Sequence, residues 1–338
     1  METHDKHHAP GRKHGHQHGH QHGSHQGADE AGMADTLDLD ALLLQEPMKE
    51  IFALTAAHRP DPAVIMDLGA GTGTGTLGLA RTFPQASIVA VDQSEFMLAR
   101  LIAMVEGEGL GGRVTTEQVD LDSAWPKVAN VDLVWVALAM HHMGDPDAVY
   151  EKIARTLSPG GLLVVIEMAG WVRYLPEDLG LGAPGLEQRC HTAVASAAWN
   201  SYPDWATAIE AAGMGMVERR EFNYVADGPA VADKQELIAQ AALAFLAKVR
   251  AGQAALSESA SGSEDLTSSN HTGSARAFTG TVPSDSAISE STQSGSLLSD
   301  EDLATLDRLL DPNDRHFLGN RTDLSVRANR RVWVARKN

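Results

Sequence analysis

The chain has 338 residues, of which 43% are hydrophobic, so it can bury a core for one large domain or two. A formal net charge of −18 argues against nucleic acid as a substrate, because a surface that follows phosphates needs clustered Lys and Arg. The single cysteine, Cys190, excludes internal disulfides, and no apolar run reaches the ~18 residues of a membrane span. We therefore expect a cytoplasmic protein without nucleic-acid or membrane partners.

The first 35 residues form a histidine-rich segment. Nine of the fifteen histidines lie between His4 and His25, in His-Gly-His-Gln repeats without large apolar residues. Imidazoles at such spacing can bind nickel, zinc or copper, but this composition offers nothing to fold around. We interpret residues 1–35 as a disordered tail with incidental metal affinity and assign no metal site to it.

Residues 64–75 carry the most informative motif of the chain. Val64–Met66 is typical of a short buried parallel strand, and a glycine-rich turn leads from it into a helix. This context is typical of nucleotide binding, because backbone amides and a helix start face the ligand. Asp67, at the strand end, would repel a pyrophosphate. It suits the ammonium group of S-adenosylmethionine, so the motif favours a methyl-donor site.

A dinucleotide site is the alternative interpretation of the same glycines. Gly73–Gly78 matches the fingerprint G-x-G-x-x-G. However, its first glycine lies several residues past the strand end, where the tight turn should already have happened. An NAD-binding site therefore stays open as the second possibility.

A second strand over residues 86–91 ends in Asp92. About 20 residues beyond the glycines, a carboxylate at a strand tip can accept hydrogen bonds from ribose hydroxyls, and Gln93 beside it can assist. Asp92 could instead cap the next helix, but Ser94 is itself a suitable cap. Asp92 is therefore available to a ligand.

Three further apolar runs, residues 114–119, 131–136 and 159–166, predict strands, with helical spacings between most of them. Asp120 and Leu121 close the first of these and can bind an adenine through a carboxylate and a backbone amide. Alternating strands and helices of this length predict an open, doubly wound α/β sheet with ligands at the carboxyl ends of its strands.

In order, these motifs resemble those of class I S-adenosylmethionine-dependent methyltransferases, closest to the small-molecule branch with a type 11 or type 25 domain. The resemblance covers roughly residues 40–225 and 324–336 and includes Met140-His-His-Met-Gly-Asp-Pro and Leu157-Ser-Pro-Gly-Gly. It implies a Rossmann-like, mostly parallel seven-stranded sheet with an antiparallel last strand. It also implies S-adenosyl-L-methionine as cofactor. The implied cofactor-binding residues are Asp67, Gly69, Ala70, Gly71 and Gly73 at the methionine end, Asp92 and Gln93 at the ribose, Asp120 and Leu121 at the adenine, and the backbone near Leu138 at the ligand's flank.

Methyl transfer chiefly requires alignment, and a hydroxyl, thiol or protonated amine acceptor also requires a base. His142 is the candidate, with His141 as a substitute, because it lies just beyond the fourth strand, where the ligand crevice opens. The alternative is that His142 packs the crevice wall or caps the following helix. Glu167, at the end of the fifth strand, is expected to face the same mouth and bind substrate.

The rest of the chain is less patterned. Residues 171–202 form either a lid or a structural connection, and the basic residues of 327–337 suggest an ordinary solvated face. A helical insertion, residues 232–310, separates the last two strands; whether it covers the substrate pocket is open. The expected organisation is a disordered tail (1–35), a methyltransferase domain (36–256), a disordered Ser-rich insertion (257–299), and a C-terminal helix with the last strand (300–338).

The sequence therefore predicts S-adenosylmethionine-dependent methyl transfer to a small-molecule acceptor. An NAD-dependent oxidoreductase is one alternative. A non-catalytic S-adenosylmethionine-binding or metal-binding protein is the other. Neither the acceptor nor the oligomeric state can be assigned, because the acceptor pocket is built from the least patterned residues.

Overall fold

The computed structural model of the protein describes residues 22–196, 203–262 and 298–338. Within them, one seven-stranded sheet has the order β3-β2-β1-β4-β5-β7-β6. β7 runs antiparallel to β5 and β6, and the other strand pairs are parallel. The strands are β1 (Val64–Leu68), β2 (Ser87–Asp92), β3 (Val114–Gln118), β4 (Val131–Ala137), β5 (Leu157–Met168), β6 (Met214–Ala226) and β7 (Val326–Lys337).

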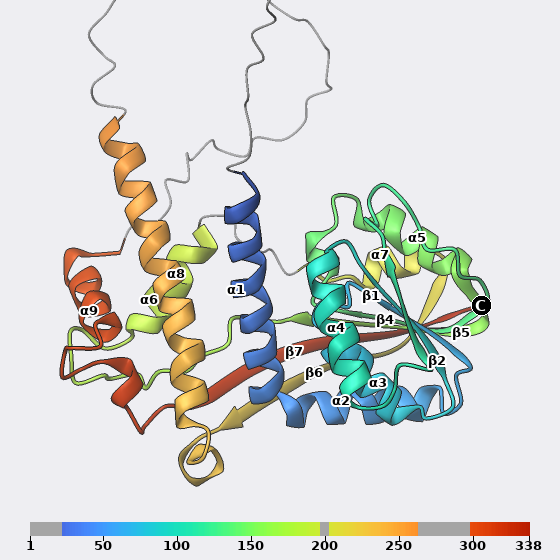
Figure 1. The fold of residues 1–338 in the computed structure, drawn as a ribbon, viewed down its shortest axis with the longest axis horizontal. Coiled ribbons are helices and arrows are strands. Elements are labelled where there is room, and N and C mark those ends of the chain that lie inside the picture. Colours follow the sequence, from blue (N-terminus) through green and yellow to red (C-terminus); the bar gives the residue numbers. More distant parts are fainter. Residues whose placement is uncertain (1–21, 197–202, 263–297) are drawn as a thin grey trace, which may run out of the picture.

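Helices cover both faces of this sheet (Figure 1). On one face α2, α3 and α4 bury Ile51, Leu79 and Leu101 against the strands, and on the other α5 and α7 bury Tyr150 and Ile209. The described helices are α1 (His22–Leu43), α2 (Gln45–His58), α3 (Thr74–Thr82), α4 (Glu95–Gly107), α5 (Pro146–Thr156), α6 (Leu186–Ser196), α7 (Ala206–Ala211), α8 (Gln235–Gly262) and α9 (Asp300–Leu310). The predicted doubly wound fold, with its antiparallel last strand and helical insertion, is confirmed.

Side-chain caps start two of the helices that follow strands of the sheet. Ser94 accepts a hydrogen bond from the Met97 amide at 3.2 Å and so begins α4, as the sequence predicts. Asp145 accepts from the Ala148 amide at 3.0 Å and begins α5. Each cap satisfies an amide that the first helical turn leaves unpaired, and thereby fixes the loop at the carboxyl end of the strand.

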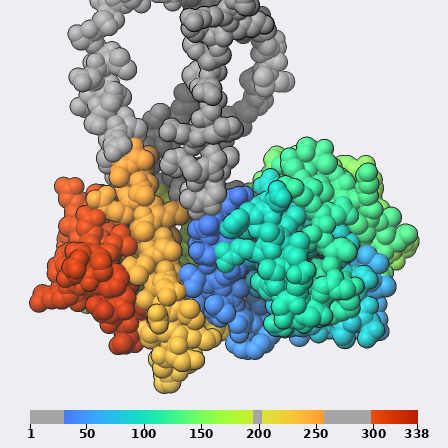
Figure 2. Space-filling view, viewed as in Figure 1, coloured from blue at the N-terminus to red at the C-terminus, as the bar shows by residue number. Residues whose placement is uncertain are grey.

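Strands β6 and β7 extend beyond the other strands and carry a second group of helices (Figure 1). We call α6, α8, α9 and their connecting segments the helical lobe. It has an apolar core of its own, to which Leu186, Leu246 and Leu306 contribute from the three helices. Helix α1 lies between this lobe and α4, as the space-filling view shows in blue (Figure 2).

Two segment boundaries differ from those expected. Residues 22–35, assigned by composition to a disordered tail, belong to α1, and α8 continues to Gly262, past the expected boundary at 257. Tertiary contacts explain the first difference, because Ala34 is buried and Glu30 accepts a hydrogen bond from Ser94 of the sheet body. Residues 1–21 and 263–297, most of the predicted tail and Ser-rich insertion, lie outside the described residues. Nowhere in the described ranges does a helix combine the length and apolarity needed to cross a membrane.

Candidate active site

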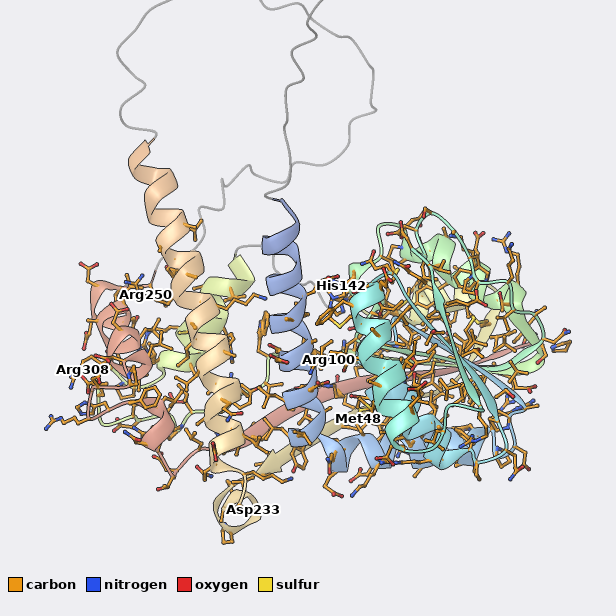
Figure 3. All side chains as sticks on the ribbon, in the orientation of Figure 1. Met48, Arg100, His142, Asp233, Arg250 and Arg308 are labelled. Carbon is orange, nitrogen blue, oxygen red and sulfur yellow. The ribbon has the colours of Figure 1, made fainter. Side chains whose placement is uncertain are left out.

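A cavity of about 520 Å³ opens at the carboxyl ends of the parallel strands. Its volume lies within the range of small-molecule sites, which is roughly 300–1,000 Å³. The loops after β1, β2, β3 and β4 form its floor, and α1 covers it from the opposite side. In Figure 3, His142 and Met48 mark two ends of the space beside α1. The lining includes Asp67, Gly69, Ala70, Gly71, Asp92, Gln93, Asp120, Leu121, Leu138 and His142.

The glycine loop after β1 forms the part of the cavity floor that lies against the residues following β4. A Cβ atom at Gly69, where φ is +67°, would lie 2.4 Å from the Cβ of Ala139, so glycine is required for this close approach. Gly73 differs from the other predicted cofactor residues, because it does not line the cavity. With φ at +97° it precedes α3, and a Cβ there would collide with Leu101 of α4. Its role in this structure is to let α3 pack against α4.

Asp67 lies at the back of the cavity as a buried carboxylate. Its residue is 2% exposed, and Oδ2 accepts a hydrogen bond of 2.6 Å from the Thr76 hydroxyl. Burial raises the pKa of Asp67 to about 7, with the charge of Asp92 acting in the same direction. A Cβ at Gly75 would lie 3.2 Å from Oδ2 and 3.0 Å from Trp135 Nε1, so glycine lets α3 pack closely against this carboxylate. Asp67 itself lines the cavity, and a buried acid at a cavity wall fits a cationic ligand group such as an ammonium.

Asp92, at the tip of β2, is held by the loops on either side. Its Oδ2 accepts a hydrogen bond of 2.8 Å from the Gly71 amide, and its Oδ1 accepts one of 2.9 Å from the Ser94 amide. Each carboxylate oxygen has a second acceptor position, so Asp92 is oriented without being saturated. Neighbouring Gln93 is exposed, and its carbonyl accepts a hydrogen bond from Gln118.

Asp120 and Leu121 follow β3 at the same edge. Asp120 folds its own turn by accepting hydrogen bonds from the Asp122 amide at 3.1 Å and from the Ser123 hydroxyl at 3.0 Å. The Leu121 side chain is buried, and its backbone lies beside Asp120 at the cavity. The turn therefore presents a fixed backbone and an apolar side chain, which suit a flat heterocycle.

Leu138, after β4, has a left-handed backbone with φ at +56°, which a non-glycine residue adopts at a cost of ~1 kcal/mol or more. Its amide donates a hydrogen bond of 2.8 Å to the Ile166 carbonyl of β5. The bend turns the chain across the carboxyl ends of β4 and β5. The chain then leads to His141 and His142, of which His142 lines the cavity.

The two adjacent histidines have different surroundings. His142 lines the cavity, and its pKa is lowered by burial and by the neighbouring His141. His141 Nδ1 lies 2.8 Å from Glu167 Oε2, and Glu167 is 0% exposed. The expectation that Glu167 faces the mouth of the site is therefore wrong: its side chain turns inward, where the His141 ring and backbone amide meet it.

Sequence reasoning missed two parts of the site. Arg330 of β7 lines the cavity and is 3% exposed, so the prediction of a solvated basic face is wrong there. β7 is flanked by strands on both sides, and alternate side chains along it point to opposite faces. The Arg330 guanidinium donates a hydrogen bond of 2.8 Å to Asp40 of α1.

Helix α1 is the second missed part, and it forms the cover of the cavity. Its lining residues recur at helical spacing on one face: Glu30, Met33, Leu37, Asp40 and Ala41, followed by Leu44 just after the helix. Arg100 of α4 extends toward it (Figure 3) and bonds Asp35 at 2.8 Å and Asp38 at 2.5 Å. By contrast, no described residue of 232–262 or 298–310 lines the cavity. The hydrophobic residues of α1 recur with only weak helical periodicity, so the sequence does not indicate this helix.

Residues 171–202, which the sequence left open as a lid or a structural connection, pack into the helical lobe over their described part. Arg189 bonds Asp302 of α9, and the His191 ring lies 4.8 Å from that of Phe245. Trp199 and Tyr202 lie outside the described residues.

The sheet order and this cavity define a Rossmann-like protein whose ligand binds at the carboxyl ends of its strands. Residues 65–161 match the family model described as a methyltransferase domain. Residues 65–161 are thus similar to a methyltransferase domain, which agrees with the resemblance of the motifs to class I S-adenosylmethionine-dependent methyltransferases.

Curated relatives agree with this assignment. The chain is 32% identical over 112 residues to trans-aconitate 2-methyltransferase of Acidovorax sp. (strain JS42), which covers 33% of this chain and 41% of that one. It is 29% identical over 177 residues to a ubiquinone/menaquinone biosynthesis C-methyltransferase of Syntrophotalea carbinolica, covering 48% of this chain and 69% of that one. It is 28% identical over 134 residues to a malonyl-acyl-carrier-protein O-methyltransferase of Methylovorus sp. (strain MP688), covering 39% and 45%. The chain thus spans 41% of the length of the first of these relatives.

Proposed function

We propose that the protein transfers a methyl group from S-adenosylmethionine to a small-molecule acceptor in the described cavity. The observation that carries the proposal is the placement of Asp67, a buried carboxylate that lines the cavity, at the glycine loop of a stretch that matches a methyltransferase domain. The names of two relatives refer to trans-aconitate and to a malonyl group. They support a small or carrier-bound acid as the first acceptor to test.

Each predicted residue has a role in this proposal that its position supports. Asp67 receives the ammonium of the methionine end, and Asp92 accepts hydrogen bonds from the ribose hydroxyls. Asp120 and Leu121 hold the adenine, with Gln93 beside the ribose and the Leu138 bend along the ligand's flank. Gly69, Ala70 and Gly71 allow the backbone to approach, whereas Gly73 acts indirectly by setting the start of α3.

When bound, S-adenosylmethionine supplies a methyl group on a sulfonium whose carbon–sulfur bond breaks with both electrons passing to sulfur. The acceptor atom forms the new bond to carbon from the opposite side, and a protonated acceptor must lose its proton. Neutral His142 accepts that proton on a ring nitrogen at the cavity wall. Alignment by the cavity is the larger contribution, worth up to ~7–11 kcal/mol in well-oriented systems.

The acidic lining also separates this proposal from an NAD-dependent oxidoreductase. Asp67 would place a carboxylate against a pyrophosphate at the glycine loop, whereas Asp92 suits the ribose of either ligand. The cytoplasmic location and the absence of nucleic-acid partners stay predictions from the single cysteine and the net charge of −18.

Titration calorimetry with S-adenosylmethionine, S-adenosylhomocysteine and NAD tests the proposed function. We expect binding of the first two ligands and no detectable binding of NAD. Binding of NAD alone would support the oxidoreductase. Failure of all three ligands to bind would contradict the proposed function.

A further inference from the structure

Arg330 is a cationic group placed where the cavity is otherwise acidic. Among the described lining residues it is the one Lys or Arg, and five Asp and one Glu side chain also line the space. His142 does not add a cation at neutral pH, because burial lowers its pKa. The acids of this lining are Glu30, Asp40, Asp67, Asp92, Asp120 and Asp122.

The sheet order sets Arg330 apart from the groups assigned to the cofactor. Asp67 is the next-to-last residue of β1, Asp92 ends β2 and Asp120 follows β3, so these carboxylates belong to the β3-β2-β1 side of the sheet. β7 is three strands away from β1, which is roughly 14 Å at the usual spacing of ~4.8 Å between strands. Arg330 pairs in register with Met168, at the end of β5. It therefore lies on the flank of the cavity away from the groups assigned to the cofactor.

The contacts of Arg330 leave it capacity to bind a ligand. From the described residues, one terminal nitrogen donates to Asp40 at 2.8 Å and the other to the Asn329 carbonyl at 3.4 Å. A guanidinium carries five N–H donors in a planar fork and can bind a carboxylate on a second edge. A buried ion pair rarely adds stability over apolar packing, so a stabilising role alone does not explain it at the wall of a cavity.

We propose that the acceptor carries a carboxylate and that Arg330 binds it. This inference rests on the proposed function and specifies its substrate class. Arg330 is the one Lys or Arg among the described lining residues, so it is the cation that can pair with a carboxylate in this cavity. Because Asp40 belongs to α1, the same guanidinium also joins the bound acceptor to the helix that covers it.

The test measures binding of small acids to the full chain loaded with S-adenosylhomocysteine. The probes are trans-aconitate, succinate and benzoate, each compared with its amide by titration calorimetry. We expect at least one acid to bind at least tenfold more tightly than its amide. Arg330→Met should weaken binding of that acid at least thirtyfold and abolish the preference for the acid over its amide.

Arg331→Met is the matched control, because Arg331 is the next residue of β7, carries the same charge and pairs with Glu221 instead. It should leave acid binding within twofold of wild type. Should Arg330→Met fail to fold, Arg330→Lys and Asp40→Asn serve in its place. The lysine variant should bind the acid several-fold less tightly and keep some preference over the amide. Asp40→Asn should bind it at least as tightly as wild type.

The same experiment separates the acceptor from the cofactor as the source of the carboxylate. Arg330→Met should bind S-adenosylhomocysteine within twofold of wild type. A large loss of S-adenosylhomocysteine affinity with unchanged acid binding would overturn the inference and assign Arg330 to the methionine carboxylate. No binding of any probe acid, or equal binding of acid and amide, would also overturn it while leaving the proposed function intact. Absence of S-adenosylhomocysteine binding in the wild type would contradict the proposed function itself.

Discussion

At the scale of single residues, Asp67 combines burial with a position at the glycine loop, and both bear on its charge. Burial raises its pKa to about 7, so the carboxylate is half protonated near neutrality before a ligand arrives. An ammonium ligand binds the ionised form. Ligand affinity should therefore increase as the pH rises through 7, by roughly eight- to tenfold between pH 6 and pH 8.

Calorimetric titration of S-adenosylhomocysteine at these two pH values measures this effect. Asp67→Asn should weaken binding at least tenfold at pH 8, because a charge-assisted hydrogen bond contributes ~1.5–3 kcal/mol. It should also remove the pH dependence. An unchanged dissociation constant in the variant would show that Asp67 does not bind the cofactor.

His142 gives the second prediction at this scale. Because burial and His141 lower its pKa, the base should already be neutral below the ordinary histidine value of about 6.5. The turnover rate should therefore rise with pH along a limb centred below 6.5. His142→Ala should remove that limb and reduce turnover by ~10²–10⁴-fold, with affinity for S-adenosylhomocysteine unchanged. If affinity and turnover fell together and the pH profile did not change, His142 would only pack against the ligand at the cavity wall and would not act as the base.

At the scale of elements, the motif-bearing strands were predictable and the cover was not. The carboxyl ends of β1 to β4 carry Asp67, Asp92, Asp120 and Leu138 in the expected order, because hydrophobic runs and turn residues fix them locally. Helix α1 depends on contacts with α4, α8 and β7, which lie far away in the sequence. Arg330 was misread for the same reason, since which strands flank β7 depends on the whole sheet.

If α1 covers the bound ligand, substitutions of two leucines on this helix should have different effects on ligand release. Leu37 lines the cavity, and its Cδ1 would lie 3.4 Å from a Cβ atom at Gly71. Leu42, on the same helix, is 44% exposed. Leu37→Ala should raise the dissociation rate of S-adenosylhomocysteine roughly four- to fifteenfold, since each buried methylene contributes ~0.8 kcal/mol. Stopped-flow displacement measures the rate, and Leu42→Ala should leave it unchanged; equal effects of the two variants would mean that α1 does not contact the ligand.

At the scale of the whole molecule, the helical lobe has a core separate from the two faces of the sheet. His191 lies in that core between Trp171 and Phe245, 5% exposed, and burial lowers its pKa to about 4. The unfolded chain therefore binds a proton more readily than the folded one between pH 6.5 and pH 4. The free energy of unfolding should fall as the pH falls through this range.

His191→Phe keeps the aromatic packing and removes the titration. Relative to wild type, its free energy of unfolding should rise by up to about 2 kcal/mol on going from pH 7 to pH 5, as measured by urea titration. The comparison of variant with wild type cancels the opposite contribution of Glu187, whose pKa burial raises to about 7. Parallel stability curves would show that the His191 ring can be protonated without unfolding the lobe.

The chain leaves the sheet at Ala226 and returns at Val326, and these two residues are partners in adjacent strands. A segment whose ends are neighbours can be lengthened, shortened or exchanged during evolution without altering the order of the strands. The cofactor motifs lie elsewhere, between β1 and β5. Replacement of residues 227–325, even by a tight hairpin turn, would therefore preserve the strand order and the motifs between β1 and β5, whereas the cover helix α1 would lose its contacts with α8.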